Sequence, residues 1–181
     1  MRPTRPEVAA AYGRTIPDLI APGLAVLFCG INPSLYSAAV GQHFARPGNR
    51  FWPALHAAGF TDRLLRPAEQ PELLDRRLGI TNLVARATAR ADELSAEEFV
   101  AGATILEAKV RRHRPRFVAV LGVTAYRAAF GRRLAVVGRQ AEMLAGAGLW
   151  VLPNPSGLNA HYQLPDLARA FEDLRLAAAA S

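Results

Sequence analysis

Four short apolar runs, spread widely along the chain, constrain the fold most strongly. They occupy residues 25–29, 79–83, 117–121 and 149–152. Each run is short and mostly apolar, which is typical of strands that are buried on both faces of a parallel sheet. Parallel neighbours need long crossover connections, and these are usually helical. The runs therefore predict a short central parallel sheet.

Helical patterns fill the gaps between these runs. The pattern over 95–113 is the strongest, because Ser95 and Glu98 have the spacing of a capping box and apolar residues recur at helical intervals. Strands that alternate with helices predict an α/β fold, a three-layer α/β/α sandwich with right-handed crossovers. The other expected helices cover 50–58, 68–78, 124–130 and 165–178.

The length of 181 residues fits one domain with a sizeable core. Residues 1–18 are rich in Pro, Arg and small side chains and are expected to form a flexible N-terminal extension, which leaves 19–181 as a single domain. No apolar stretch approaches the roughly 18 residues of a membrane span. The first residues also lack the apolar core of a secretory signal. We therefore expect a cytoplasmic protein with no membrane partner.

The charge of the chain favours a polyanionic partner without identifying it. The formal net charge is +7, and Lys109 is the only lysine among 22 basic residues. A basic protein attracts nucleic acid, but an excess of arginine is equally consistent with genome composition. Cys29 is the only cysteine. It lies in an apolar run, where a buried inert thiol is the expected state.

Two polar elements follow the first and the last apolar run. Residues 30–34 read Gly-Ile-Asn-Pro-Ser, and residues 154–158 read Asn-Pro-Ser-Gly-Leu. In an open α/β sheet the loops at the carboxyl ends of the strands form the ligand crevice. These two loops, more than a hundred residues apart, are therefore expected to meet at one site.

Several common kinds of site are absent from the sequence. The four histidines show no metal-ligand spacing, and no dinucleotide fingerprint, phosphate-binding lysine loop or nucleophile elbow is present. We therefore expect neither a metal nor a cofactor. What remains is a set of amides, hydroxyls and aromatics. Among these, Asn32 can orient a water molecule through its carboxamide oxygen, although it has no basicity.

The segment after the first polar loop leaves alternatives open. Phe44 lies in a polar, loop-like stretch, and a plug of the core beneath the loop is the simpler interpretation. Asn49 is a natural N-cap for the helix that follows. Arg50 is suited to hold either a phosphate or a neighbouring carboxylate.

Taken together, four blocks resemble one family: residues 30–34, 44–52, 79–84 and 154–158. The resemblance is to the mismatch-specific (Mug-type) uracil-DNA glycosylase and thymine-DNA glycosylase branch of the uracil-DNA glycosylase superfamily, and it extends from about Asp18 to the last helix. It implies a monomeric, monofunctional repair enzyme for double-stranded DNA with G:U or related mismatches. Such an enzyme flips uracil, and variably thymine or damaged pyrimidines, out of the duplex and hydrolyses the N-glycosidic bond.

The resemblance also implies roles for individual residues. Asn32 would position the attacking water, and Phe44 would stack on the flipped base. Ile31, Ser37, Asn82 and Asn154 would line the base pocket, while Ser156, Gly157, Leu158 and Asn159 would contact DNA, with Leu158 as the wedge. Two positions depart from the family pattern. Ala160 stands where bacterial members often have an arginine, whose place Asn159 or a nearby arginine would have to take, and Asn82 stands where some have lysine.

An asparagine cannot accept a proton from water, so a carboxylate is a candidate helper. Asp92 and Glu93 follow the 79–84 block and leave the same end of the predicted sheet. Asp92 is suited to activate the water or to stabilise a cationic sugar. Alternatively, both acids stabilise the N-terminus of the next helix. Two other functions also stay open, a free-nucleoside hydrolase and a non-catalytic module that binds mismatched DNA.

Overall fold

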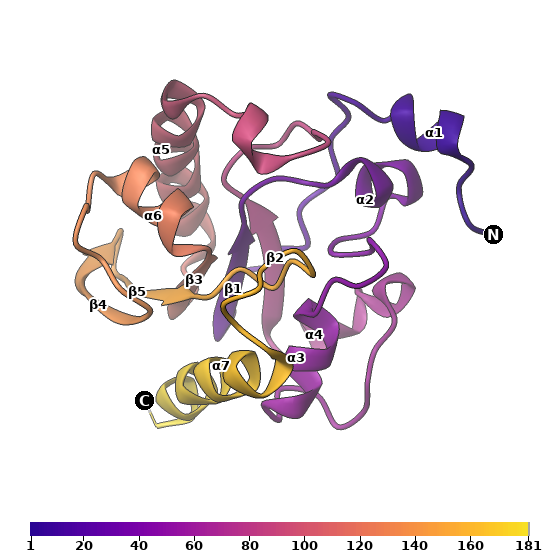
Figure 1. Cartoon of the computed structure of the whole chain (residues 1–181). Coiled ribbons are helices and arrows are strands. Elements are labelled where there is room, and N and C mark those ends of the chain that lie inside the picture. The colour runs from indigo at the N-terminus through magenta and orange to yellow at the C-terminus, as the bar shows by residue number, and fades with distance from the viewer. Residues whose placement is uncertain (181) are drawn as a thin grey trace.

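The computed structural model describes residues 1–180 and is built on a five-stranded sheet (Figure 1). The strand order is β2-β1-β3-β5-β4, and all neighbours are parallel except β4 and β5. The strands are β1 (Val26–Gly30), β2 (Leu78–Asn82), β3 (Phe117–Leu121), β4 (Gly138–Leu144) and β5 (Ala147–Leu152). This confirms the predicted α/β fold, and the four apolar runs correspond to β1, β2, β3 and β5.

Strand β4 is the element that the apolar runs do not reveal. It lies at the edge of the sheet, and its residues alternate between partly and fully exposed until Leu144. It turns back into β5 through Ala145 and Gly146, which both have positive φ. An edge strand with one wet face carries too few apolar residues to stand out as a buried run.

Helices cover both faces of the sheet (Figure 1). On one face α5 (Ala96–His113) and α6 (Val123–Phe130) pack against the strands. On the other face lie α3 (Phe51–Ala57), α4 (Glu72–Asp75) and α7 (Leu164–Ala179). Ser95 and Glu98 form the predicted capping box of α5. None of the helices within residues 1–180 combines the length and apolar composition needed to cross a bilayer.

The predicted helix over 68–78 is divided into two short elements. These are the 3₁₀ helix η1 (Pro67–Glu69) and α4 (Glu72–Asp75). Pro71 separates them, because a proline lacks the N–H that a continuous helix needs and clashes with the preceding turn. Another helix, α2 (Leu35–Val40), follows the first polar loop directly, and its N-cap is Ser34.

Residues 1–18 are packed against the domain, although the sequence suggests a flexible extension. Thr4 and Glu7 form a capping box for helix α1 (Arg5–Ala9). Ala11 and Ile16 are buried in a small cluster with residues of α2. Asp18 forms an ion pair with Lys109 Nζ at 2.7 Å. The sequence signal for α1 is the Thr-x-x-Glu spacing of a capping box, which lies within an otherwise loop-like composition.

Candidate functional site

A cleft of about 670 Å³ opens at the carboxyl ends of the strands. Gly30, Asn82, Leu121 and Pro153, which end or directly follow β1, β2, β3 and β5, line it. The two polar loops therefore meet at one site, as the parallel sheet predicts.

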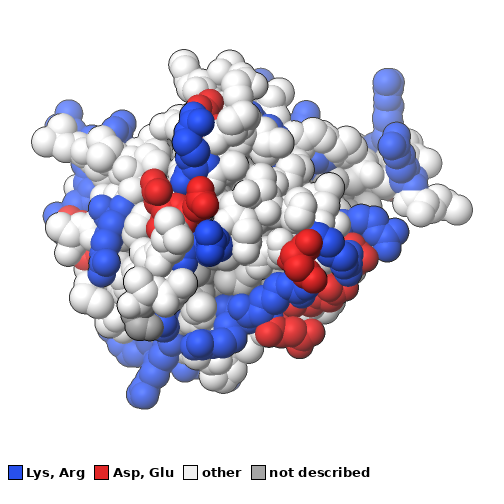
Figure 2. All heavy atoms as spheres, turned by 90° about the horizontal axis from the view of Figure 1, so that it is seen from below, with Lys and Arg blue, Asp and Glu red and all other residues white. Residues whose placement is uncertain are grey.

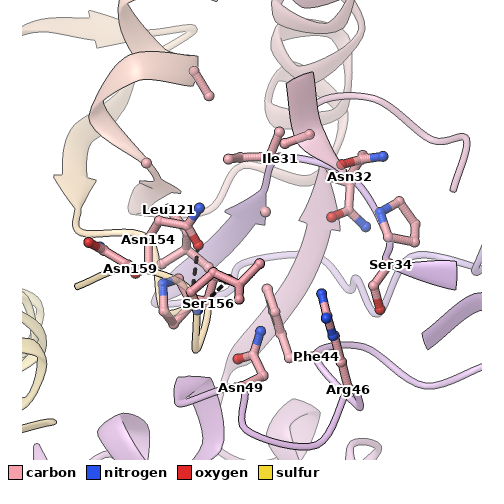
Figure 3. A pocket seen from close by; sticks show the side chains of 18 of the residues that line it. Ile31, Asn32, Ser34, Phe44, Arg46, Asn49, Leu121, Asn154, Ser156 and Asn159 are labelled. Carbon is pink, nitrogen blue, oxygen red and sulfur yellow. Dashed lines mark hydrogen bonds between the residues drawn. The ribbon is translucent and has the colours of Figure 1, made fainter. Parts of the chain in front are cut away.

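Nearly all of the residues singled out from the sequence lie in this cleft. In Figure 3, Asn32 and Asn154 approach from opposite sides, with Phe44 between them. Gly157 is the one residue of the set that does not line the cleft directly. Its backbone packs so closely on Gly48 that an added Cβ would lie 2.7 Å from the Gly48 carbonyl oxygen. The residues that line the cleft are Ile31, Asn32, Ser37, Phe44, Asn82, Asp92, Asn154, Ser156, Leu158 and Asn159.

Asn32 is held in one orientation by its amide nitrogen. Nδ2 donates to the carbonyl oxygen of Arg86 at 3.0 Å and to Thr88 Oγ1 at 2.8 Å. The Thr88 hydroxyl donates its own proton to the Arg90 carbonyl at 2.7 Å, so it can only accept from Asn32. Both neighbours of Nδ2 are therefore acceptors. The carboxamide oxygen, which has no partner among residues 1–180, is left to bind a ligand or water.

The loop after β2, which supplies the two acceptors of Asn32, is itself held in place. The chain after β1 runs beside the chain after β2, because Leu83 N donates to Gly30 O and Val84 N donates to Ile31 O. Arg86 Nε reaches Glu98 in the capping box of α5 at 2.6 Å. The Arg86 guanidinium, and then the Ser95 N–H, lower the pKa of the Glu98 carboxyl to about 2. This carboxylate therefore stays ionised at neutral pH and anchors the Asn32 loop to α5.

Phe44 has a strained backbone, and its ring lies between the core and the cleft. Its φ is 52°, which is uncommon for a bulky residue. One face of the ring stacks on Phe51, with centroids 4.2 Å apart and an interplanar angle of 25°. The side chain also lines the cleft. Phe44 is thus both the plug that the sequence suggests and a platform at the site.

The neighbours of Phe44 stabilise its conformation. The imidazole of His43 is 2% exposed, and its Nε2 lies 3.0 Å from the Pro17 carbonyl oxygen. Burial lowers the pKa of His43, which keeps the ring neutral. The His43 carbonyl accepts from Trp52 Nε1, and the N–H of Ala45 donates to Ser37 Oγ. Such contacts are what allow a strained residue to persist at a site.

The Ser37 side chain helps to hold the segment that carries Phe44. Its Oγ accepts from Ala45 N at 3.0 Å and lies 3.0 Å from the Oγ of Ser34. The side chain is nearly fully buried. Although Ser37 lines the cleft, it joins α2 to the segment that carries Phe44.

Gly30 leaves room for two cleft residues. An added Cβ there would lie 2.6 Å from Asn82 Oδ1 and 3.2 Å from Phe44 Cζ. Asn82 and Phe44 therefore converge above the end of β1, at the floor of the cleft.

The second polar loop is stabilised by hydrogen bonds between its own residues. Asn154 Oδ1 accepts from Ser156 N at 3.0 Å, and Asn159 Nδ2 donates to the Asn154 carbonyl at 3.0 Å (Figure 3). The Asn159 amide is thus engaged inside the loop. Leu158, by contrast, is 74% exposed at the tip. An apolar side chain is presented to solvent on a loop that is otherwise internally bonded.

Asp92 lies at the rim of the cleft in η2 (Ala91–Glu93). Its side chain is 71% exposed and forms an ion pair with Arg90 Nε at 3.1 Å. Glu93 accepts instead from the Arg90 N–H and caps the turn. Of these two acids, Asp92 lines the cleft and Glu93 does not.

The cleft carries a cation that has no acidic partner. Arg46 lines it, and no Asp or Glu among residues 1–180 lies within ion-pair distance of this guanidinium. Some arginines elsewhere are neutralised by acidic neighbours, and on the face shown in Figure 2 basic and acidic side chains lie side by side. Arg63 contacts both Glu69 and Glu72, for example. The positive charge that remains available at the cleft favours an anionic ligand.

Two supporting residues were not anticipated in these roles. Thr88 fixes the amide of Asn32, and no motif in the sequence marks it. Arg50 donates to three loop carbonyls, those of Ser156, Asn159 and Tyr162, rather than to a neighbouring carboxylate. Asn49 Oδ1 accepts from Phe51 N at 2.9 Å, but the N-cap position of α3 is Arg50, one residue later than the sequence suggests.

The fold and the cleft define a three-layer α/β/α protein whose ligand site is built from polar loops at the carboxyl ends of parallel strands. Residues 17–175 match the model of the uracil DNA glycosylase superfamily, and the chain belongs to that superfamily. The chain is accordingly a DNA glycosylase. It is also similar to the solution NMR structure of a protein from Methanosarcina acetivorans that is provisionally named a uracil DNA glycosylase. The TM-score is 0.57 at 21% identity, over 90% of this chain and 98% of the other. That likeness concerns the fold.

Proposed function

We propose that this chain is a monofunctional, mismatch-specific uracil-DNA glycosylase that acts as a monomer on G:U and related mismatches in double-stranded DNA. One observation carries the proposal. Asn32 is bonded through its amide nitrogen so that its oxygen is left for a water molecule, in the same cleft as the ring of Phe44. We place this reaction on chromosomal DNA in the cytoplasm.

The proposed reaction begins with extrusion of the uracil nucleotide. Extrusion costs a few kcal/mol, and the cost is least at a mismatch. The exposed Leu158 fills the space that the base leaves in the stack, as apolar wedges do in other DNA complexes. The free base then lies on the ring of Phe44, where stacking contributes about 1–3 kcal/mol.

Hydrolysis needs a water molecule on the sugar and stabilisation of the charges that separate. As the N-glycosidic bond breaks, the sugar becomes cationic and the pyrimidine leaves with negative charge. Asn32 Oδ1 orients the water for attack on the sugar carbon, while hydrogen-bond donors near the base oxygens stabilise the leaving group. The products are the free base and an abasic site, and the reaction requires no cofactor.

A comparison of substrates tests this function. The purified chain is incubated in excess with a G·U duplex, an A·U duplex, single-stranded uracil DNA and free deoxyuridine, and base release is followed. We expect uracil to be released fastest from the G·U duplex. Release from deoxyuridine alone would indicate a nucleoside hydrolase, and tight duplex binding without an abasic product would indicate a non-catalytic mismatch-binding module. The same assay with thymine, hypoxanthine and ethenocytosine defines the range of bases.

We further propose that Asp92 assists the reaction electrostatically, beside the cationic sugar or the water. Because its carboxylate is 71% exposed and therefore screened, we expect Asp92→Asn to slow single-turnover excision by about 10-fold, below the usual range for a full general base. Glu93→Gln is the matched control, since the Glu93 side chain caps the turn. This variant should excise uracil at the wild-type rate. Equal rates for both variants and the wild type would remove the carboxylate from the mechanism.

A further inference from the structure

Arg50 links the two halves of the cleft through a set of contacts that none of the roles above uses. Its backbone N–H donates to the Pro155 carbonyl at 2.9 Å. One terminal nitrogen, Nη2, donates to the carbonyls of Ser156 at 2.6 Å and Asn159 at 3.0 Å. The other, Nη1, donates to the carbonyl of Tyr162. One residue therefore holds four carbonyl groups, on both sides of Leu158.

The remaining surroundings of Arg50 show that these carbonyls are its main partners. No Asp or Glu among residues 1–180 lies within ion-pair distance of its guanidinium. Its Nε is buried and has no hydrogen-bond partner among those residues. A guanidinium that gives up water without a carboxylate needs strong acceptors, and donation from a charged group strengthens a hydrogen bond to a carbonyl. The carbonyls of the loop supply this compensation.

We infer that Arg50 is a positioning residue that holds the 156–162 loop in the conformation from which Leu158 enters the duplex. This inference rests on the proposed function. Arg50 is the N-cap residue of α3 and follows directly on the segment that carries Phe44, so one arginine fixes the wedge relative to the stacking platform. The planar fork of the guanidinium suits this task, because its donors reach several carbonyls at once in a fixed geometry.

A lysine at this position keeps the charge but loses the fork. We therefore expect Arg50→Lys to lower the single-turnover rate of uracil release by about 10-fold, and Arg50→Met, which has no donors, by about 30-fold. The rate constant is measured at saturating enzyme concentration, where an inactive fraction of misfolded protein leaves it unchanged. Arg77→Lys is the control. The guanidinium of Arg77 likewise donates to backbone, with two hydrogen bonds to the Gly23 carbonyl, but it lies far from the cleft.

A double-variant cycle separates the proposed role from general damage. If Arg50 acts through the placement of Leu158, then Arg50→Lys should cost about 10-fold in the wild-type background and less than about 2-fold in Leu158→Ala. The fluorescence of 2-aminopurine next to the uracil should show the same loss of base extrusion. Independent, multiplying effects of the two substitutions would overturn the inference.

Amide hydrogen exchange in the free protein tests the same inference without relying on excision. Arg50→Lys should speed exchange at Gly157–His161 by at least 10-fold and leave α7 unchanged, whereas Arg77→Lys should change neither. Unchanged exchange in the loop would overturn the role of Arg50 even if uracil is excised. If Arg50→Lys speeds exchange in the loop but the wild-type protein releases no uracil, the proposed function is contradicted. The role of Arg50 in holding the loop is then still supported.

Discussion

Replacement of Asn32 by alanine is expected to slow uracil release by about 1,000-fold. The substitution removes a carboxamide whose nitrogen is held by two acceptors and whose oxygen has no partner among residues 1–180. A nucleophile that loses its orientation loses a large part of the catalytic advantage, and 1,000-fold corresponds to about 4 kcal/mol of transition-state stabilisation. The measurement is a single-turnover time course with enzyme in excess over a G·U duplex.

Binding and stability must be followed in the same variant. Asn32→Ala leaves the Arg86 carbonyl and the Thr88 hydroxyl without this donor, which costs about 1 kcal/mol in unfolding free energy. Gln140→Ala is the matched control, since Gln140 also donates its amide to two carbonyls, at Val136 and Gly138, on the β4 side of the molecule. It should excise uracil normally. If Asn32→Ala retains more than a tenth of the wild-type rate while it binds the duplex, the water is positioned by another group.

The sheet, and the edge of the sheet that carries the cleft, could be predicted from the sequence because both depend on local, repeated signals. A strand that is buried on both faces is mostly apolar, so β1, β2, β3 and β5 are visible as short runs. The parallel arrangement then places residues 30–34 and 154–158 at one edge. Strand β4 escapes this logic because it is half exposed, and the 68–78 helix is broken by the local chemistry of Pro71.

The supporting contacts of the site could not be predicted in the same way. Asn32 depends on Thr88 and Arg86, and Phe44 depends on His43 and Pro17, pairs that only the folded chain brings together. A side chain such as Arg50 has the chemistry to bind a phosphate, a carboxylate or a carbonyl, and its sequence neighbours do not decide among them. The choice is made by which acceptors the tertiary structure places within reach.

Replacement of Phe44 by alanine is expected to slow uracil release by about 100-fold. One face of its ring is already stacked on Phe51, so the variant loses the platform in the cleft and exposes the ring beneath. Stacking of a base on an aromatic side chain contributes about 1–3 kcal/mol, and the upper part of that range corresponds to about 100-fold. Phe44→Leu, which keeps an apolar contact without a π face, should lie between the alanine variant and the wild type.

The decisive control for Phe44 is a second stacked phenylalanine outside the cleft. Phe130 stacks on Tyr126 at 4.8 Å and 27°, is also partly buried, and packs on the opposite face of the sheet. Phe130→Ala should lower the melting temperature about as much as Phe44→Ala, because both remove one aromatic contact with the core. It should nevertheless leave excision within about 2-fold of wild type. If the two variants lose activity equally, Phe44 acts through the stability of the fold, and the base is held by some other surface of the cleft.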